Sequence, residues 1–389
     1  MTSFTHSTQT RTMTALPPLS LYIHVPYCIH KCSYCDFFSI GVGNAAIPSA
    51  DIMTRIVHEL SHMVDTLGLQ GRTVQSIFFG GGTPSMVPAR ELARVLDCAA
   101  QHFVMGDIEI TCEANPETVH DAMARALRAM GVNRLSIGVQ SFHAHHLKFL
   151  ERVHSSDRAI AAIAAAQTAG FTNLNLDLIF GLPDQTPAEI TADIAQALRL
   201  GTTHISAYQL TIEPHTPLAA QVSAGRVMPI DDERALRYWL SVRAQLAAAG
   251  FTAYEVSNFA RDGFPCAHNR HYWRMGEYLG VGPGAVSRID NRRWRRARHL
   301  KKYLAGELIV DESETLTPAA QQLEFGMLNL RTTEGLSLEY FQQHFGATFD
   351  DCYPMLRQRW NDAGWLASDD PIILNERGLA VLDSLAAEL

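Results

Sequence analysis

The chain has 389 residues, which exceeds the usual range of about 100 to 200 residues for one domain, so we expect one large barrel-like domain or two domains. Hydrophobic residues at 47% and charged residues at 19% are near the globular average, which excludes a largely disordered or fibrous chain. The net charge of -8 argues against nucleic acid or anionic lipid as a partner, and no apolar run approaches the roughly 18 residues that a membrane span needs.

The first segment, residues 1–19, is rich in Thr and Ser and ends close to two prolines. We expect a disordered leader, because the segment has no continuous apolar core of the secretory kind and too few Arg residues for a transit peptide. The cytoplasm is therefore the predicted location.

From Leu21 onward, short apolar runs alternate with longer helical patterns, which indicates repeated βα units around a parallel sheet. Six strands are predicted, at Leu21–Val25, Val74–Phe79, Ile108–Cys112, Arg134–Val139, Leu174–Phe180 and Ile205–Leu210. Helical patterns lie between them at Ala50–Leu67, Ala89–Phe103, Glu117–Met130, Ser156–Ala169 and Pro187–Leu200. Six units are fewer than the eight that close a TIM barrel. We predict an α/β fold with a partial (β/α)6 TIM-like barrel over residues 20–250, and a doubly wound sheet is the alternative.

Three of the predicted strands alternate between polar and apolar residues, whereas buried parallel strands normally read as continuous apolar runs. Their polar faces carry Glu109, Thr111, Glu113, Arg134, Ser136, Gln140, Asn173, Asn175 and Asp177. If the apolar faces pack against the surrounding helices, the polar faces line an interior that holds water or a polar ligand. The alternative, exposure at a sheet edge, explains one such strand better than three.

The repeat ends after a helical stretch at Glu233–Ala249. Residues 251–300 are rich in Gly, aromatic, His and Arg residues without clear periodicity, and we expect them to form a lid or platform. Residues 301–389 show helical spacing at Ala319–Leu330 and Tyr353–Ala363 and are predicted to form a smaller α-rich C-terminal domain, with the winged-helix type as one option.

A cluster of cysteines, Cys28, Cys32 and Cys35, directly follows the first predicted strand. Thiolates at this spacing select zinc or an iron-sulfur cluster. A structural zinc site needs four ligands, and His24 or His30 could complete one. A cubane held by three cysteines instead leaves one iron open, as a cofactor-chelating cluster requires. The spacing favours the iron-sulfur cluster.

The CxxxCxxC pattern, with Tyr34 before its last cysteine, resembles the radical S-adenosylmethionine family. The FFGGGTPS segment at Phe78–Ser85 resembles the loop that holds the methionyl amino and carboxylate groups in that family. We expect its glycines to let backbone N–H groups approach the ligand. Further segments resemble the oxygen-independent coproporphyrinogen oxidase branch, namely CEANPE, GVQSF, LERVH and DLIFGLP.

This resemblance implies a 4Fe-4S cluster on Cys28, Cys32 and Cys35 and S-adenosylmethionine on its open iron. The implied S-adenosylmethionine contacts are Tyr22, Gly81, Gly82, Thr83, Glu113, Gln140, Arg152 and Asp177. Three of these contacts also lie on the polar strand faces, where carboxylate and amide groups suit ammonium and hydroxyl groups.

Two departures point within this superfamily to the HemW-type haem chaperones. The oxidases of this branch resemble CxxxCxxCxC, whereas Phe37 stands here at the place of the last cysteine. They also resemble one another in a longer segment ahead of the first strand, whereas only about 20 residues precede that strand here. The segment Cys266–Ala285 resembles the HNxxYW segment of the chaperones, with His268, Asn269, Tyr272 and Trp273 in place.

The resemblance implies haem as a further ligand and His268 as its axial ligand, since imidazole binds haem iron and adjacent aromatic residues can form a wall for the macrocycle. His271 and Cys266 are the rival ligands. The Arg-rich stretch Arg288–Arg298 could pair with haem propionates or form a solvated helix face.

The predicted function is haem delivery to an acceptor haemoprotein, with a respiratory protein as one candidate. The alternative is radical oxidative decarboxylation of coproporphyrinogen III, and a third class is a zinc-stabilised interaction protein.

Overall fold

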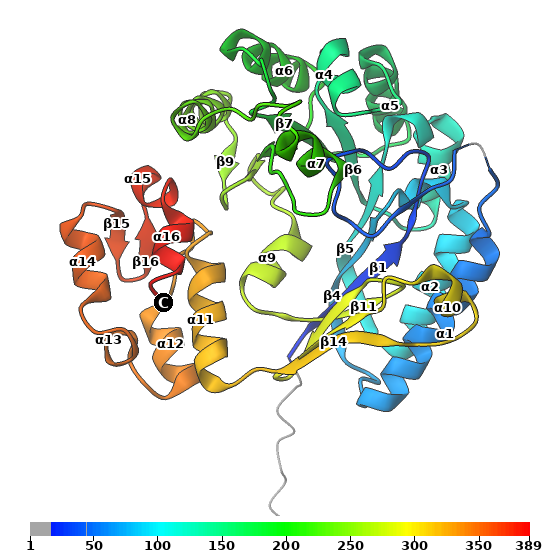
Figure 1. Ribbon diagram of the computed structural model, residues 1–389. Helices are drawn as coiled ribbons and strands as arrows, with labels where there is room; N and C mark the ends of the chain where they lie inside the picture. The colour runs from blue at the N-terminus through cyan, green and yellow to red at the C-terminus, as the bar shows by residue number, and fades with distance from the viewer. Residues whose placement is uncertain (1–16, 44) are drawn as a thin grey trace, which may run out of the picture.

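The computed structural model describes residues 17–43 and 45–389, and Figure 1 shows the path of the chain. Most of the predicted leader at residues 1–19 therefore lies outside the described residues. In the described part, one sheet holds twelve strands in the order β14-β13-β12-β11-β1-β4-β5-β6-β7-β8-β10-β9. Among these residues, a helix with the length and apolar character of a membrane span does not occur.

Six consecutive strands of this sheet run parallel and follow the order of the chain. They are β1 (Leu19–Val25), β4 (Thr73–Gly81), β5 (Val104–Ala114), β6 (Arg134–Gln140), β7 (Asn173–Phe180) and β8 (His204–Gln209). All six predicted strands are thereby confirmed. A strand order without reversal is that of a barrel, because a doubly wound sheet reverses at its switch point. The partial barrel is confirmed.

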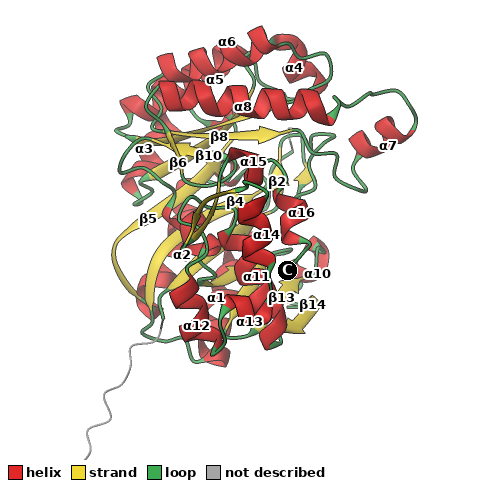
Figure 2. Ribbon diagram, turned by 90° about the vertical axis from the view of Figure 1, so that its left-hand side faces the viewer, coloured by secondary structure: helices red, strands yellow, loops and turns green. Residues whose placement is uncertain are grey.

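Helices cover the outer face of the curved sheet (Figures 1 and 2). They are α1 (Ser49–Leu67), α2 (Ala89–His102), α3 (Asp121–Ala129), α4 (Ala144–Phe149), α5 (Ser156–Thr168), α6 (Pro187–Arg199) and α8 (Asp232–Ala248). The predicted helix at Glu117–Met130 begins later than expected, because Pro116–Thr118 forms a separate 3-10 turn and His120 caps α3.

The apolar strand faces and the helices form the main core. Leu135, Ile137 and Val139 of β6 are fully buried in it, as are Ile52 and Ile56 of α1. Since strand side chains alternate between faces, this packing turns the polar residues of the same strands toward the barrel interior.

Residues 251–300 contain more regular structure than expected. β11 (Glu277–Val281) pairs in parallel with β1, and β12 (Val286–Ile289) and β13 (Arg292–Arg296) continue the sheet in antiparallel fashion. β14 (Val310–Thr315), from beyond residue 300, adds a further antiparallel strand. The short β9 (Thr252–Ala253) and β10 (Asn258–Ala260) lie at the other edge. The helix-face interpretation of Arg288–Arg298 is therefore wrong, because most of this stretch forms a β-hairpin.

A helix of the same segment, α9 (Ala267–Trp273), lies against β4 and β11. In Figure 1 it stands between the barrel and the C-terminal helices. The remaining short elements of this half are β2 (Tyr27–Cys28), β3 (Ile40–Gly41), α7 (Pro217–Ser223) and α10 (Leu300–Leu304).

The C-terminal region has a core of its own, formed around Phe325, Phe341 and Trp360. Its elements are α11 (Pro318–Asn329), α12 (Leu338–Phe345), α13 (Phe349–Cys352), α14 (Leu356–Asp362), β15 (Leu366–Asp369), β16 (Ile372–Leu374), α15 (Glu376–Leu379) and α16 (Leu382–Ala386). The region is α-rich, as predicted. The domain boundaries at residues 250 and 300 stay a prediction, although β11 and β12 join the barrel sheet.

Candidate functional site

A polar cavity with a volume of about 590 Å³ lies inside the curve of the parallel sheet. Glu113, Gln140, Asn175 and Asp177 line it, as do all three clustered cysteines. The polar strand faces thus enclose a ligand-sized space, as the alternation of the strands predicts.

The three thiols lie where the first strand passes into its loop. Cys28 and Cys32 are buried and Cys35 is half-buried. Thr83 Oγ1 donates to Cys28 Sγ at 3.5 Å, and an Nη of Arg152 lies 3.6 Å from Cys32 Sγ. Burial raises the pKa of the Cys28 and Cys35 thiols. Buried thiolates therefore need a cationic centre beside them, which the iron of a cluster provides.

The three thiols are not gathered as closely as a single tetrahedral zinc ion requires. A tetrahedral zinc ion with Zn–S bonds of about 2.3 Å brings its thiolates to about 3.8 Å from one another. Among the described residues, the Sγ atoms of this cysteine triad do not all lie within 4.8 Å of one another. His24 is also unsuitable as a fourth zinc ligand, because both ring nitrogens are engaged, by Phe38 O at 2.8 Å and Tyr22 Oη at 3.2 Å.

The glycine segment packs closely against the first strand and its loop. A Cβ at Gly81 would come within 2.5 Å of the His24 ring, and one at Gly82 within 2.5 Å of the Tyr27 carbonyl oxygen. The N–H of Gly81 donates to Glu113, and that of Gly82 to the Val25 carbonyl oxygen. These glycines allow close packing inside the protein, and their contact with S-adenosylmethionine stays a prediction.

The acidic groups of the cavity are held in place by neighbours. Glu113 accepts a hydrogen bond from Gly81 N at 3.1 Å, and Asp177 accepts one from Asn175 Nδ2 at 2.7 Å. Burial, together with the charge of Asp177, raises the pKa of Glu113 to about 8. A cationic ligand group in this cavity would favour the ionised carboxylates.

Arg152 and Gln140 complete this side of the cavity. Arg152 donates to Asn115 Oδ1 at 2.7 Å and to the Gly138 carbonyl oxygen at 2.8 Å. Gln140 is held in the left-handed backbone region, with φ of 68°. Such a conformation is costly for a residue with a side chain, and it occurs where the surroundings fix it.

Two of the predicted contacts do not themselves line the cysteine cavity. Thr83 is buried behind Cys28 and does not line the cavity of the cysteines. Tyr22 lines a neighbouring cavity, and its hydroxyl contacts His24. The structure thus brings together Gly81, Gly82, Glu113, Gln140, Arg152 and Asp177 around the cysteine cavity.

The raised pKa of Glu113 predicts a pH dependence of stability. Between the ordinary glutamate pKa of 4.5 and about 8, Glu113 in the folded ligand-free protein retains a proton that the unfolded chain releases. This contribution to the free energy of unfolding is fully present below pH 4.5 and is lost as the pH rises through about 8. We therefore expect Glu113→Gln to stabilise the ligand-free protein more at pH 9 than at pH 6, relative to wild type. Denaturant unfolding at both pH values measures the difference, and an equal effect would contradict the prediction.

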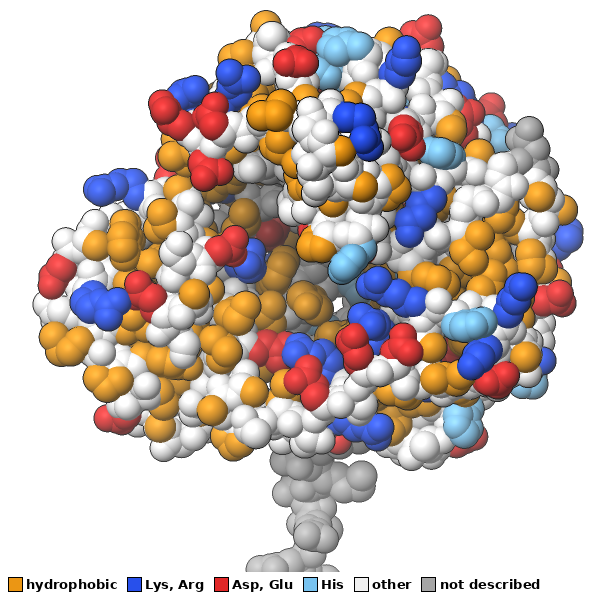
Figure 3. All heavy atoms as spheres, viewed as in Figure 1, with side chains coloured by type: hydrophobic (Ala, Val, Ile, Leu, Met, Phe, Trp, Pro, Cys, Tyr) orange, Lys and Arg blue, Asp and Glu red, His pale blue; other side chains and the backbone are white. Residues whose placement is uncertain are grey.

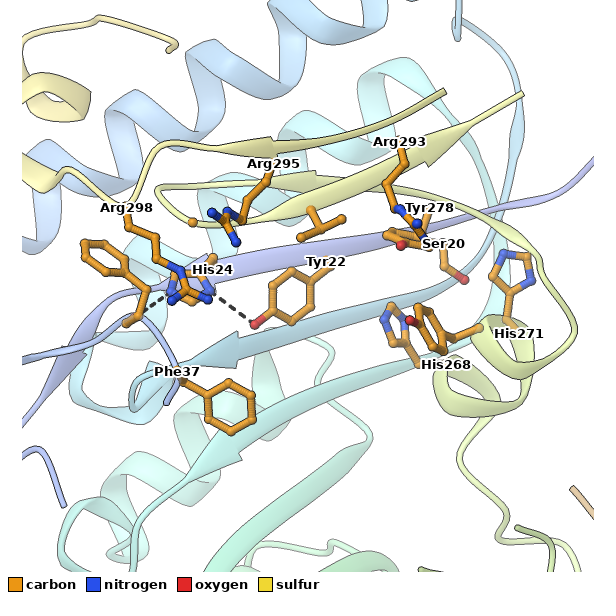
Figure 4. Close-up of a pocket in the computed structure, with 14 residues that line it drawn as sticks. Ser20, Tyr22, His24, Phe37, His268, His271, Tyr278, Arg293, Arg295 and Arg298 are labelled. Atoms are coloured by element: carbon orange, nitrogen blue, oxygen red, sulfur yellow. Dashed lines mark hydrogen bonds between the residues drawn. The ribbon is translucent and has the colours of Figure 1, made fainter. Parts of the chain in front are cut away.

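The neighbouring cavity, of about 380 Å³, is lined by aromatic residues, histidines and arginines (Figure 4). Its walls include Tyr22, Phe37, His268, Tyr278, Arg293, Arg295 and Arg298. The ring of Phe78 lies 5.0 Å from that of His268, centroid to centroid. A flat apolar macrocycle with acidic groups at its edge would find suitable partners here.

His268 presents its imidazole to this cavity. Nδ1 is 2.9 Å from Ser76 Oγ, and among the described residues Nε2 has no hydrogen-bond partner. Burial lowers the pKa of His268 to about 3, so the ring is neutral near pH 7 and carries a lone pair. A second opening, of about 320 Å³ and lined by His268, Tyr272 and Arg331, adjoins the first. Figure 3 shows the surface hollowed between the barrel and the C-terminal helices.

The two rival ligands are less suited to bind a metal. Both ring nitrogens of His271 are engaged, by Gln75 and by the Glu277 carbonyl oxygen. The Cys266 thiol is fully buried and donates to Glu109 at 3.2 Å. Burial raises its pKa to about 12, which disfavours the thiolate.

Phe37 links the two cavities. Its side chain is 69% exposed and lines both the cysteine cavity and the His268 cavity. The sequence pattern identified Phe37 as the residue in place of a fourth cysteine, but it did not indicate this position. Ser20, Phe38 and Tyr278 of the His268 cavity were also missed, since nothing in their local sequence marks them.

A partial barrel with a CxxxCxxC loop at its polar cavity defines a radical S-adenosylmethionine protein. The Radical SAM superfamily model matches residues 22–197, and the HemN C-terminal domain model matches residues 316–381. Membership in this superfamily implies a 4Fe-4S cluster and S-adenosylmethionine.

The chain is 37% identical over 379 residues to the "Heme chaperone HemW" of Escherichia coli (strain K12), which covers 96% of this chain and 98% of that protein. It is 40% identical over 330 residues to the "Heme chaperone HemW" of Mycobacterium tuberculosis (strain ATCC 25618 / H37Rv), over 82% of this chain and 83% of that one. The chain belongs to the HemW family of heme chaperones.

A solved structure of the Escherichia coli coproporphyrinogen III oxidase HemN, described as a radical SAM enzyme, shares the fold. The TM-score is 0.81 at 23% sequence identity, over 96% of this chain and 90% of that one. At this sequence identity the similarity shows a shared fold and does not show a shared reaction.

Proposed function

We propose that this protein binds haem in the His268 cavity and transfers it to an acceptor haemoprotein. In this proposal Cys28, Cys32 and Cys35 hold the 4Fe-4S cluster, and the adjoining polar cavity holds S-adenosylmethionine. The observation that carries the proposal is the position of the neutral His268 imidazole between aromatic walls, in a cavity that meets the cysteine cavity at Phe37.

The chemistry of the cavity supports haem as its ligand. An imidazole Nε2 lone pair suits haem iron, and the rings of Tyr272 and Tyr278, 5.5 Å apart between centroids, offer apolar surface to a porphyrin. Arg293, Arg295 and Arg298 supply guanidinium groups for the propionates.

The cysteine cavity supports the cluster and its cofactor. When bound there, the cluster supplies an open iron to which an amino and a carboxylate group can chelate. The residues of this cavity proposed to contact S-adenosylmethionine are Gly81, Gly82, Glu113, Gln140, Arg152 and Asp177. Tyr22, from the neighbouring cavity, and Thr83, beside Cys28, are proposed as further contacts at its border. Arg152 orients this set, because it contacts Cys32 as well as the strand end at Gly138.

Haem titration of the cluster-loaded protein without oxygen tests the proposal. We expect a saturable shift of the Soret band in the wild type and an affinity at least about tenfold lower, or ~1.4 kcal/mol, in His268→Ala. The exposed His62 on α1 provides the control, and His62→Ala should bind haem as wild type does. Absence of saturable haem binding, together with conversion of coproporphyrinogen III by the same preparation, would overturn the proposal in favour of the oxidase.

The arginine groups lead to a second prediction. Arg298 is 43% exposed and lies 3.9 Å from Asp36, so Arg298→Ala should leave the fold intact. We expect it to weaken haem binding several-fold, by about 1 kcal/mol, because a propionate loses a charged partner. Titration with the dimethyl ester of haem, whose propionates carry no charge, should show no difference between wild type and variant. An equal loss with both ligands would refute the propionate contact.

The proposal also includes the location of the protein, its haem acceptor and the roles of its domains. We place haem transfer in the cytoplasm and propose a respiratory haemoprotein as the acceptor. We also propose that residues 20–250 form the radical S-adenosylmethionine partial barrel, residues 251–300 the haem-binding platform and residues 301–389 the α-rich C-terminal domain.

A further inference from the structure

A group of histidines lies on the outside of the barrel, away from both cavities. His143, His145 and His146 are found at and just after the start of α4, which lies beside α6 (Figures 1 and 2). Glu189 is in the first turn of α6. One donor atom each from His145, His146 and Glu189 lies within 4.8 Å of the others.

The Glu189 carboxylate presents one oxygen to each imidazole. His145 Nε2 is 2.9 Å from Oε1, and His146 Nε2 is 3.5 Å from Oε2. The two imidazole rings lie only 4.0 Å apart between centroids. Two imidazolium ions at this distance would repel one another, whereas a shared cation would be attracted by all three groups.

His146 supplies an independent indication of a ligand. Its side chain is 3% exposed, and its Nε2 atom is buried without a hydrogen-bond partner while it points toward the carboxylate. A buried polar atom without a partner costs free energy that a bound ion would restore.

The donor groups are held in position by their surroundings. Glu189 Oε2 accepts hydrogen bonds from Thr186 N at 2.8 Å and Thr186 Oγ1 at 2.9 Å, as part of a capping box. His143 Nε2 contacts the Glu189 carbonyl oxygen at 3.2 Å. Asp193 of α6 accepts from Phe142 N at 2.7 Å and thereby fixes the turn before α4. Donors supported in this way need little rearrangement to bind an ion.

We propose that His145, His146 and Glu189 bind one zinc-class divalent transition metal ion, with water completing the coordination. Imidazole nitrogen and carboxylate oxygen are suitable ligands for zinc, and three protein ligands plus water is an established zinc arrangement. The site is distinct from the cysteine triad in both position and donor type.

The bound ion would join α4 to α6 beside the turn that begins at Gln140. That residue lines the cysteine cavity in the left-handed region, and the turn is otherwise held by Asp193. Zinc is therefore expected to stabilise this corner of the barrel and to raise the Tm of the protein.

Equilibrium dialysis of the cluster-loaded full-length protein against Zn²⁺ tests the site. We expect one zinc per chain in addition to the iron, and an affinity at least about tenfold lower in His145→Ala and in Glu189→Gln. Both variants should fold, because His145 is 64% exposed and Gln retains an acceptor for the Thr186 capping contacts. The double variant His58→Ala, His62→Ala removes two exposed histidines of α1 and should bind zinc as wild type does.

X-ray absorption at the zinc edge identifies the donors. We expect nitrogen and oxygen at about 2.0–2.2 Å and no sulfur at about 2.3 Å. Sulfur ligation would assign the zinc to cysteines and overturn the proposal, as would undiminished affinity in both single variants or absence of bound zinc in the wild type. Iron content and haem titration of the same samples report on the proposed function separately.

Discussion

Replacement of any one of Cys28, Cys32 or Cys35 by alanine should reduce the iron and acid-labile sulfide of the reconstituted protein to less than about one tenth of the wild-type amount. A cubane with two protein thiolates is labile, and the neighbours of these thiols are a hydroxyl and a guanidinium, which cannot replace them. Chemical analysis of iron and sulfide after desalting measures the loss.

Cys98→Ala is the matched control for the cluster prediction. Cys98 is also a buried free thiol, but it lies on α2 and contacts Ser61 at 3.3 Å. Its replacement should leave iron and sulfide at the wild-type level. Full iron and sulfide content in the three variants of the cysteine triad would contradict the cluster assignment, provided that their far-UV circular dichroism matches that of wild type.

The parallel strands and their polar faces could be predicted because the relevant pattern is local. In β6, Leu135, Ile137 and Val139 alternate with polar or small residues, and the same alternation in β5 and β7 fixes which side chains turn inward. The positions of Glu113 and Asp177 in one cavity follow from this alternation and from the parallel order of the strands.

The other strands of the sheet were missed because their pairing is remote in sequence. β11 pairs with β1 across more than 250 residues, with Leu279 opposite Leu21. No local sequence pattern indicates that these two strands pair. The β12–β13 hairpin did carry a signal. Asp290 and Asn291 form a two-residue connection between two short strands, and Asp290 has a φ of 52°, as hairpin turns require.

The positions of individual site residues depend on packing that sequence spacing does not contain. Tyr22 was expected beside S-adenosylmethionine, yet its ring stacks on Phe78 and lines the His268 cavity. The side chain direction of Tyr22 follows from the parity of β1, but which cavity lies on that side depends on where α9 packs. That packing in turn depends on Glu109, a residue that the sequence identified only as part of a polar strand face.

Glu109→Ala should destabilise the protein by about 3 kcal/mol and weaken haem binding at least about tenfold. The Glu109 carboxylate accepts from Ala267 N at 3.0 Å, from His268 N at 3.2 Å and from the Cys266 thiol at 3.2 Å. It therefore holds the start of α9, and with it the proposed haem ligand, against the barrel. The side chain is 9% exposed, and its removal also leaves the buried Arg134 guanidinium, 4.0 Å away, without its carboxylate partner.

Two further variants distinguish an effect on the position of His268 from an effect on the overall stability of the protein. Glu109→Gln keeps one acceptor for the N–H groups of α9 but removes the charge, so it should weaken haem binding less than Glu109→Ala while still leaving Arg134 unpaired. Asp107→Ala changes an exposed carboxylate on the same strand and should match wild type in both denaturant unfolding and haem titration.

If Glu109→Ala lowers stability while its Soret titration equals that of wild type, α9 does not depend on Glu109 for the placement of His268. A haem affinity that falls moderately in Glu109→Gln and further in Glu109→Ala would instead show that this barrel carboxylate positions the proposed haem ligand. Since Arg134 also lines the cysteine cavity, the same contact would then connect the two cavities through a single buried pair.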